Sequence, residues 1–206
     1  MKQTLLTGFG PFGEVVNNPA ERIARHFELS GAPGHILTVR VFPVSYEAVK
    51  SGLAALLGTE GVVQFDNIVM LGVNSRAAEW RIERIGVNAD EKGKVDATGG
   101  MAQNAEIIPG ASVQLFSNLP VDDIVRDLTA AGIPAAPSDS AGGYLCNHLL
   151  YRTLHRLQGL PSVAAGFIHV PCDPETFAAD DKNKPEFAPA FEQHVRAIEV
   201  LLEVLR

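Results

Sequence analysis

The chain has 206 residues, of which 46% are hydrophobic and 20% charged, a composition that excludes disordered and fibrous proteins. Seventeen basic residues against 24 acidic ones give a net charge of −7, which argues against nucleic acid as the main partner. No apolar run approaches the roughly 18 residues of a membrane span. The first apolar run, around Leu5 and Leu6, meets Gly8 too early for a signal peptide. We therefore expect a cytoplasmic protein of one domain, residues 1–206, that binds neither nucleic acid nor membrane.

Apolar strands and amphipathic helices alternate along the chain. Short apolar runs predict strands at residues 5–8, 36–42, 67–72, 82–87 and 163–170. Helical patterns between capping residues, glycine and proline predict helices at residues 19–29, 46–57, 121–131, 144–159 and 187–206. Asn18 and Ser45 are the expected N-caps of the first two helices. Because several strands are apolar on both faces, we expect an α/β fold: a single-domain three-layer sandwich, whose mixed, mostly parallel sheet has helices on both faces.

A glycine-rich turn follows the first strand. Residues 8–13 match the dinucleotide-binding pattern G-x-G-x-x-G, but the next helix begins only near Asn18, and Pro11 has no N–H for a phosphate. No acidic residue ends the second strand to hold a ribose, so nucleotide binding is kept only as an alternative. Phe9 and Phe12 in the turn can instead form a flat apolar slot for a small neutral ring, or pack in the core. The turn alone leaves these two interpretations open.

Cys146 lies near the start of a predicted helix that is entered through Gly142 and Gly143. Unpaired N–H groups and the positive end of the helix dipole favour a thiolate at such a place, and the thiolate is the nucleophilic form. A lone cysteine is more commonly a buried structural residue. The local sequence is compatible with both roles.

A catalytic cysteine needs a histidine that is near in space. Of the six histidines, His169 ends an apolar strand at the sheet edge where helix starts and strand carboxyl ends meet. The other five lie within helices or at the start of a strand: His26, His35, His148, His155 and His194. Glu83 lies in an apolar stretch, where it is either solvent-facing or functional, and the surface interpretation is the commoner one. A metal site at His169, Cys172 and Asp173 would crowd its ligands into one turn, so no metal is expected.

Four segments in order along nearly the whole chain resemble pyroglutamyl peptidase I, also called pyrrolidone-carboxylate peptidase, a family of cysteine peptidases. They are residues 5–13 with Asn18 and Pro19, residues 83–88, residues 141–148 and residues 166–171. The resemblance implies that Glu83, Cys146 and His169 form a catalytic triad without metal or cofactor. The activity implied is hydrolysis of the bond after an N-terminal pyroglutamyl (5-oxoproline) residue of peptides, through a thiol acyl-enzyme.

The resemblance also implies the substrate pocket and the assembly. Two phenylalanines flank the lactam ring in the family, and two further residues line the pocket, which here are Phe9, Phe12, Asn18 and Leu145. The implied assembly is a cytoplasmic homo-oligomer, commonly a homotetramer. The chain departs from the family pattern at residues 73–76, 93–96 and 172–173. A relative that binds a small lactam without cleaving it is therefore kept as a second alternative.

Overall fold

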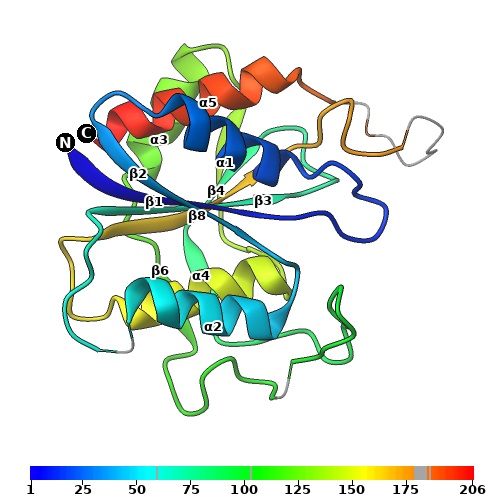
Figure 1. Ribbon diagram of the computed structural model, residues 1–206, viewed down its shortest axis with the longest axis vertical. Coiled ribbons are helices and arrows are strands. Elements are labelled where there is room, and N and C mark those ends of the chain that lie inside the picture. The colour runs from blue at the N-terminus through cyan, green and yellow to red at the C-terminus, as the bar shows by residue number, and fades with distance from the viewer. Residues whose placement is uncertain (59, 103, 179–184, 186) are drawn as a thin grey trace.

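One mixed sheet runs through the middle of the molecule, shown in Figure 1 from a computed structural model that describes residues 1–58, 60–102, 104–178, 185 and 187–206. Its strands are β1 (Lys2–Phe9), β2 (His35–Phe42), β3 (Asn67–Val73), β4 (Trp80–Glu83), β7 (Ala135–Ser138) and β8 (Ala164–Val170). Their order across the sheet is β2-β1-β3-β8-β4-β7. The first four strands of this order are parallel, β4 is antiparallel to β8, and β7 is parallel to β4. The predicted mixed, mostly parallel sheet is therefore confirmed.

Helices cover both faces of the sheet. They are α1 (Pro19–Ser30), α2 (Tyr46–Leu57), α3 (Val121–Ala130), α4 (Leu145–Arg156) and α5 (Phe191–Val204). Figure 1 shows α1, α3 and α5 on one face and α2 and α4 on the other, which gives the predicted three-layer sandwich. Among the described residues, none of the helices has the length and apolar character needed to cross a bilayer.

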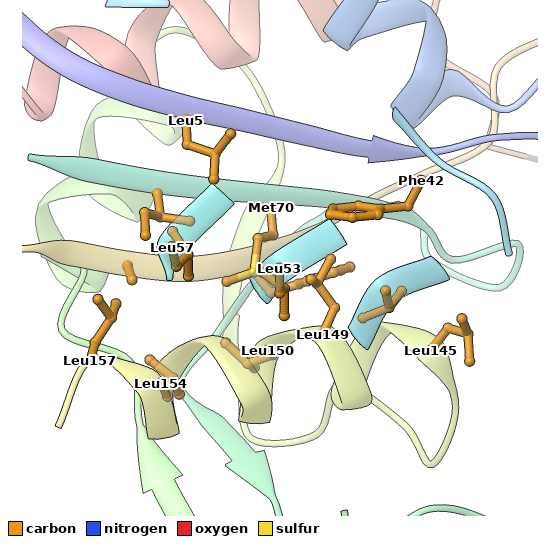
Figure 2. Close-up of a cluster of buried hydrophobic side chains, with 14 of the residues drawn as sticks. Leu5, Phe42, Leu53, Leu57, Met70, Leu145, Leu149, Leu150, Leu154 and Leu157 are labelled. Atoms are coloured by element: carbon orange, nitrogen blue, oxygen red, sulfur yellow. The ribbon is translucent and has the colours of Figure 1, made fainter. Parts of the chain in front are cut away.

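The alternation of side chains along each strand divides the core in two. Leu5 and Met70 belong to the cluster between the sheet and the helices α2 and α4, which Figure 2 shows. Leu6 and Leu71, one position along, belong to the cluster under α1, α3 and α5. Strands that are apolar on both sides are thus buried on both sides. This is the pattern that the sequence predicts for a covered sheet.

The predicted strand at residues 82–87 is wrong in detail, because the chain changes partners at Arg84. The Arg84 N–H donates to Ser138 at the end of β7, whereas its carbonyl accepts from Ser117. The next residues form β5 (Ile85–Val87), which pairs with β6 (Gln114–Phe116) in a separate two-stranded sheet. Neither β6 nor β7 was predicted from the sequence. Strand β7 contains Pro137, which a sheet tolerates at an edge.

One helix start and one helix cap also differ from the prediction. Helix α5 begins at Phe191, four residues after the predicted start. Ser45 occupies the N-cap position of α2, but its side chain makes no capping hydrogen bond. The Asp96 carboxylate, from the loop after β5, accepts the Tyr46 N–H instead at 2.9 Å. A cap supplied from 50 residues away is a tertiary contact, which local sequence patterns do not reveal.

Candidate active site

Glu83 and His169 meet across the antiparallel pair β4 and β8. In β4, Trp80 and Ile82 pack under α1, α3 and α5, so Glu83 points to the opposite face, the face covered by α4. His169 projects from β8 on the same face, and its Nδ1 lies 2.7 Å from Glu83 Oε1. The exposed fraction of Glu83 is 0%. The interpretation of Glu83 as a surface residue is therefore wrong.

Cys146 is the second residue of α4, and its half-buried thiol reaches His169. Burial lowers the pKa of the His169 imidazole, but the charge of Cys146, a hydrogen bond with its sulfur and the Glu83 carboxylate together outweigh burial and raise this pKa to about 9. At neutral pH the imidazole therefore carries its second proton beside the sulfur. The structure brings Glu83, His169 and Cys146 into one connected row.

Gly72 in β3 makes room for the thiol. It lies opposite His169 in the sheet register. A Cβ on Gly72 would lie 2.9 Å from Cys146 Sγ and 2.6 Å from Cζ of the Phe167 ring. Real Cβ atoms do not approach other atoms this closely, so the sulfur occupies space that only glycine leaves free. Gly72 was not predicted as a site residue from the sequence, although a glycine inside an apolar strand is a known signal of close approach.

We expect Gly72→Ala to displace the sulfur from the imidazole and to lower kcat/KM at least about tenfold, because the added methyl group overpacks a filled site. Hydrolysis kinetics and the rate of thiol alkylation by iodoacetamide measure the effect. Gly52→Ala is the matched control, since its Cβ would lie 2.5 Å from the Phe42 ring in the same core. If both variants lose stability alike and keep wild-type kinetics, Gly72 has no role in seating the thiol.

The other five histidines have contacts of their own away from this row. The ring of His35 contacts the Thr4 hydroxyl and the Leu202 carbonyl. His148 turns to Asp90, and His194 is buried against Trp80. His26 packs on Phe27 and Phe191, and His155 lies near Tyr151.

The groups of the alternative metal site are engaged elsewhere. The Asp173 carboxylate pairs with Arg22 and accepts from the Thr176 hydroxyl. The Cys172 thiol is fully buried, and burial raises its pKa to about 11. His169 is bonded to Glu83. In the part of the chain that the structure describes, no three His, Cys, Asp or Glu side chains gather as metal ligands would.

The four candidate pocket residues lie around the carboxyl end of β1 and the start of α4. Phe9 and Leu145 are buried in the cluster under α2 and α4, and Phe12 is half-buried against the same cluster. The Asn18 amide is engaged on both sides, since it donates to the Gly10 carbonyl at 2.9 Å and accepts the Ala20 N–H at 3.0 Å. Asn18 therefore ties the glycine-rich turn to α1. The contribution of these four residues to a substrate pocket stays a prediction.

The glycine-rich turn also has a packing role. A Cβ on Gly8 would lie 2.3 Å from the carbonyl oxygen of Ala20, so β1 and α1 touch through this glycine. The Gly10 N–H donates to Phe42 of β2. These contacts account for two glycines of the dinucleotide-like pattern without a nucleotide.

Comparison with known proteins decides the family. The sequence model of the family described as pyroglutamyl peptidase matches residues 2–206. The pyrrolidone-carboxylate peptidase of Pyrococcus furiosus is 36% identical to the chain, over 98% of this chain and 97% of that protein. The protein of the same name from Oceanobacillus iheyensis is 35% identical over 100% of both chains. The chain belongs to the pyroglutamyl peptidase family.

Solved structures agree with this assignment. The crystal structure of the pyrrolidone carboxyl peptidase from Fervidobacterium islandicum AW-1 superposes with a TM-score of 0.90 at 29% identity, over 100% of this chain and 98% of that one. The pyroglutamyl peptidase I of Bacillus amyloliquefaciens gives a TM-score of 0.86 at 26% identity, over 99% and 94% of the two chains. As a member of this family the protein is a hydrolase of the cysteine peptidase class.

Proposed function

We propose that this protein removes an N-terminal pyroglutamyl residue from peptides, with Cys146 as nucleophile, His169 as general acid and base, and Glu83 as the group that orients His169. The observation that carries the proposal is the row of contacts from Glu83 through His169 to the Cys146 thiol, in a chain of this family. We extend the proposal to the family's homo-oligomeric, commonly tetrameric, assembly and to a cytoplasmic location.

In the first step the Cys146 thiolate attacks the carbonyl carbon that joins pyroglutamate to the next residue. His169, which holds its second proton at neutral pH because its pKa is raised to about 9, then gives that proton to the leaving amine. The Glu83 carboxylate holds Nδ1–H of the imidazole and stabilises its cation. Water, deprotonated by the neutral imidazole, hydrolyses the thioester and restores the pair.

The N-terminus of α4, which we call the helix mouth, supplies donors for the developing oxyanion. The Tyr144 side chain, at the N-cap of α4, makes no capping hydrogen bond. The backbone N–H groups at this end are therefore available to an anion, as at other helix N-termini. They include the Cys146 N–H, on the same residue as the attacking sulfur. Such donors act mainly on the transition state, in which the carbonyl oxygen becomes charged.

We expect selectivity for the lactam over an open glutamine. The pyroglutamyl ring is uncharged, whereas an N-terminal glutamine carries an ammonium group that the aromatic side chains of Phe9 and Phe12 cannot pair. Hydrolysis of pyroglutamyl and glutaminyl anilides should therefore differ at least about a hundredfold in kcat/KM. Equal rates on both substrates would refute the proposed pocket between Phe9 and Phe12.

A Phe12→Ala variant should raise KM for the lactam, because the Phe12 ring is half-exposed whereas Phe9 is buried.

The alternative of a catalytically silent relative, which binds a small lactam without cleaving it, makes a different prediction. A protein that binds a lactam without cleaving it has no need of a reactive thiol. Stoichiometric alkylation by iodoacetamide near neutral pH, lost in Cys146→Ala, supports a catalytic thiol. An inert thiol and no turnover of the pyroglutamyl anilide would favour the silent relative.

A further inference from the structure

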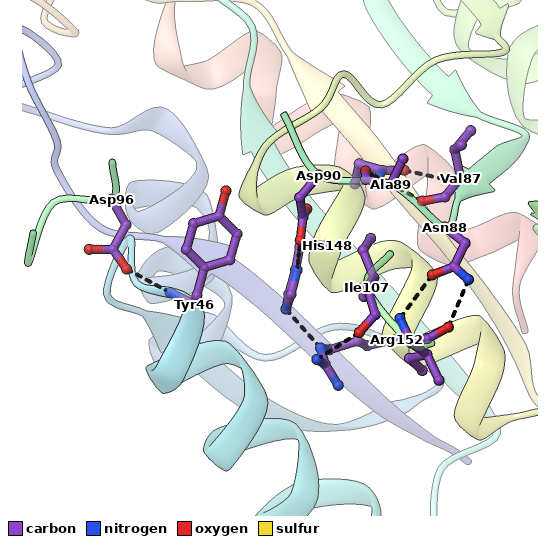
Figure 3. A network of polar contacts seen from close by, with 11 residues as sticks. Tyr46, Val87, Asn88, Ala89, Asp90, Asp96, Ile107, His148 and Arg152 are labelled. Atoms are coloured by element: carbon purple, nitrogen blue, oxygen red, sulfur yellow. Dashed lines mark hydrogen bonds and ion pairs between the residues drawn. The ribbon is translucent and has the colours of Figure 1, made fainter. Parts of the chain in front are cut away.

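Residues 88–102 and 104–108 belong to a loop whose two ends are bonded to each other beside α4. The Asn88 amide donates to the Ile108 carbonyl at 2.8 Å and accepts the Ile108 N–H at 2.9 Å. Helix α4 holds both ends of this loop. His148 contacts Asp90 near its start, and Arg152 donates to the Ile107 carbonyl near its end, as Figure 3 shows.

The proton positions in this contact follow from the donor inventory. A guanidinium has only donors, and the Arg152 Nε–H donates to His148 Nε2 at 2.7 Å. Nε2 must therefore hold a lone pair, so the single proton of a neutral His148 is on Nδ1. That proton is donated to Asp90 Oδ2 at 2.7 Å. The side chains of Asp90 and His148 are each more than nine-tenths buried. We call Asp90, His148 and Arg152 the latch.

The residue that follows Asp90 is bonded to the segment just before α4. The Glu91 N–H, directly after Asp90, donates to the Gly143 carbonyl at 2.7 Å. This bond fixes the plane of the peptide group between Gly143 and Tyr144. The peptide bond is trans, so the Tyr144 N–H points away from the loop. Gly143 also leaves room for this contact, since its Cβ would lie 3.2 Å from Glu91 Cβ.

We infer that Asp90 and His148 are positioning residues for catalysis, because through Glu91 and Gly143 they orient the Tyr144 N–H as an additional donor at the helix mouth. The inference rests on the function proposed above. The catalytic row itself is held by β4, β8 and α4, and none of its three side chains contacts the latch in the interactions of the described residues. Loss of the latch should therefore disturb an interaction with the transition state and leave the thiol and imidazole in place.

The test compares His148→Leu with His148→Gln on a pyroglutamyl anilide. Leucine can neither donate to Asp90 nor accept from Arg152, so kcat should fall about tenfold with KM within about twofold of wild type. Glutamine can donate from its NH₂ group and accept at its carbonyl oxygen, so it should restore most of kcat. His155→Leu, on the same helix outside the latch, is the matched control and should keep wild-type kinetics. If His148→Leu does not fold, Asp90→Ala in the loop replaces it.

The result that overturns the inference is a folded His148→Leu protein with wild-type kcat, or one in which only KM rises. A second readout needs no substrate. Hydrogen exchange of the Glu91 amide should accelerate in His148→Leu and not in His155→Leu, and unchanged exchange would also overturn the inference. If the wild-type protein does not hydrolyse the anilide, the proposed function fails, whereas the exchange experiment still decides whether the latch holds Glu91 on Gly143.

Discussion

Cys146→Ala is expected to abolish turnover of a pyroglutamyl anilide. Alanine has no nucleophile, and the water that remains near His169 would have to attack an unactivated amide. In related constellations, loss of the nucleophile costs about a millionfold in kcat. The variant should still bind the lactam, because the sulfur contributes little to the pocket. Its stability should change by only about 1 kcal/mol, since the thiol is half-buried and small.

Cys172→Ala is the control for this experiment. Cys172 is the other cysteine of the chain, and its thiol is fully buried against Val15 and Phe177. Burial raises its pKa to about 11, so it stays a neutral thiol at neutral pH and is a poor nucleophile. Most of the activity should remain in this variant, as measured by hydrolysis of the pyroglutamyl anilide in the presence of reductant and EDTA. The reverse result, an inactive Cys172→Ala and an active Cys146→Ala, would show that the nucleophile is assigned wrongly.

Glu83→Gln is expected to cause the second-largest loss, about 10²- to 10⁴-fold in kcat. The substitution keeps the volume of the side chain but removes the negative charge that stabilises the imidazolium. Glutamine can also turn its NH₂ group toward Nδ1, which then accepts a hydrogen bond and cannot hold a proton. The imidazole would be neutral with its one proton on Nε2, so it could not take up the proton of the thiol. Because Glu83 is one of the groups that raise the pKa of His169, its removal lowers this pKa from about 9.

A pH profile measures this shift. In Glu83→Gln the imidazole beside the sulfur should lose its second proton at a lower pH than in wild type. The pH dependence of thiol alkylation by iodoacetamide reports the pH at which this proton is lost. Glu79→Gln is the control, because Glu79 lies just before β4 with its side chain partly exposed. A Glu83→Gln protein with wild-type kcat and an unchanged alkylation profile would contradict the proposed role of Glu83.

The positions of His169 and Cys146 were predictable because each follows from a rule about element ends. An apolar strand with His169 next to its last residue and a helix that starts near Cys146 meet at the edge where the parallel strands have their carboxyl ends. Glu83 was not predictable in this way. Its strand has four residues that alternate between two faces, and the sequence does not say that α4 covers the face to which Glu83 points.

Contacts between distant segments account for the other differences. Asp96 caps α2 from a loop 50 residues away, and four hydrogen bonds outweigh burial to lower the pKa of its carboxyl group to about 2. Strand β7 consists of Ala-Ala-Pro-Ser and has little intrinsic preference for a sheet, so it forms because β4 is its neighbour. In both cases the tertiary structure decides what the local sequence leaves open.

The first turn of α4 carries three consecutive side chains with three different partners. Cys146 contacts His169 on the sheet, Asn147 bonds to the backbone of Val87 at 2.8 and 2.9 Å, and His148 contacts Asp90. Successive residues on a helix point about 100° apart, so one rotation of the helix sets all three contacts together. A one-residue insertion or deletion between the glycine turn and Cys146 would therefore break the whole set in a single event. The number of residues in this short stretch of chain therefore bears on all three contacts at once.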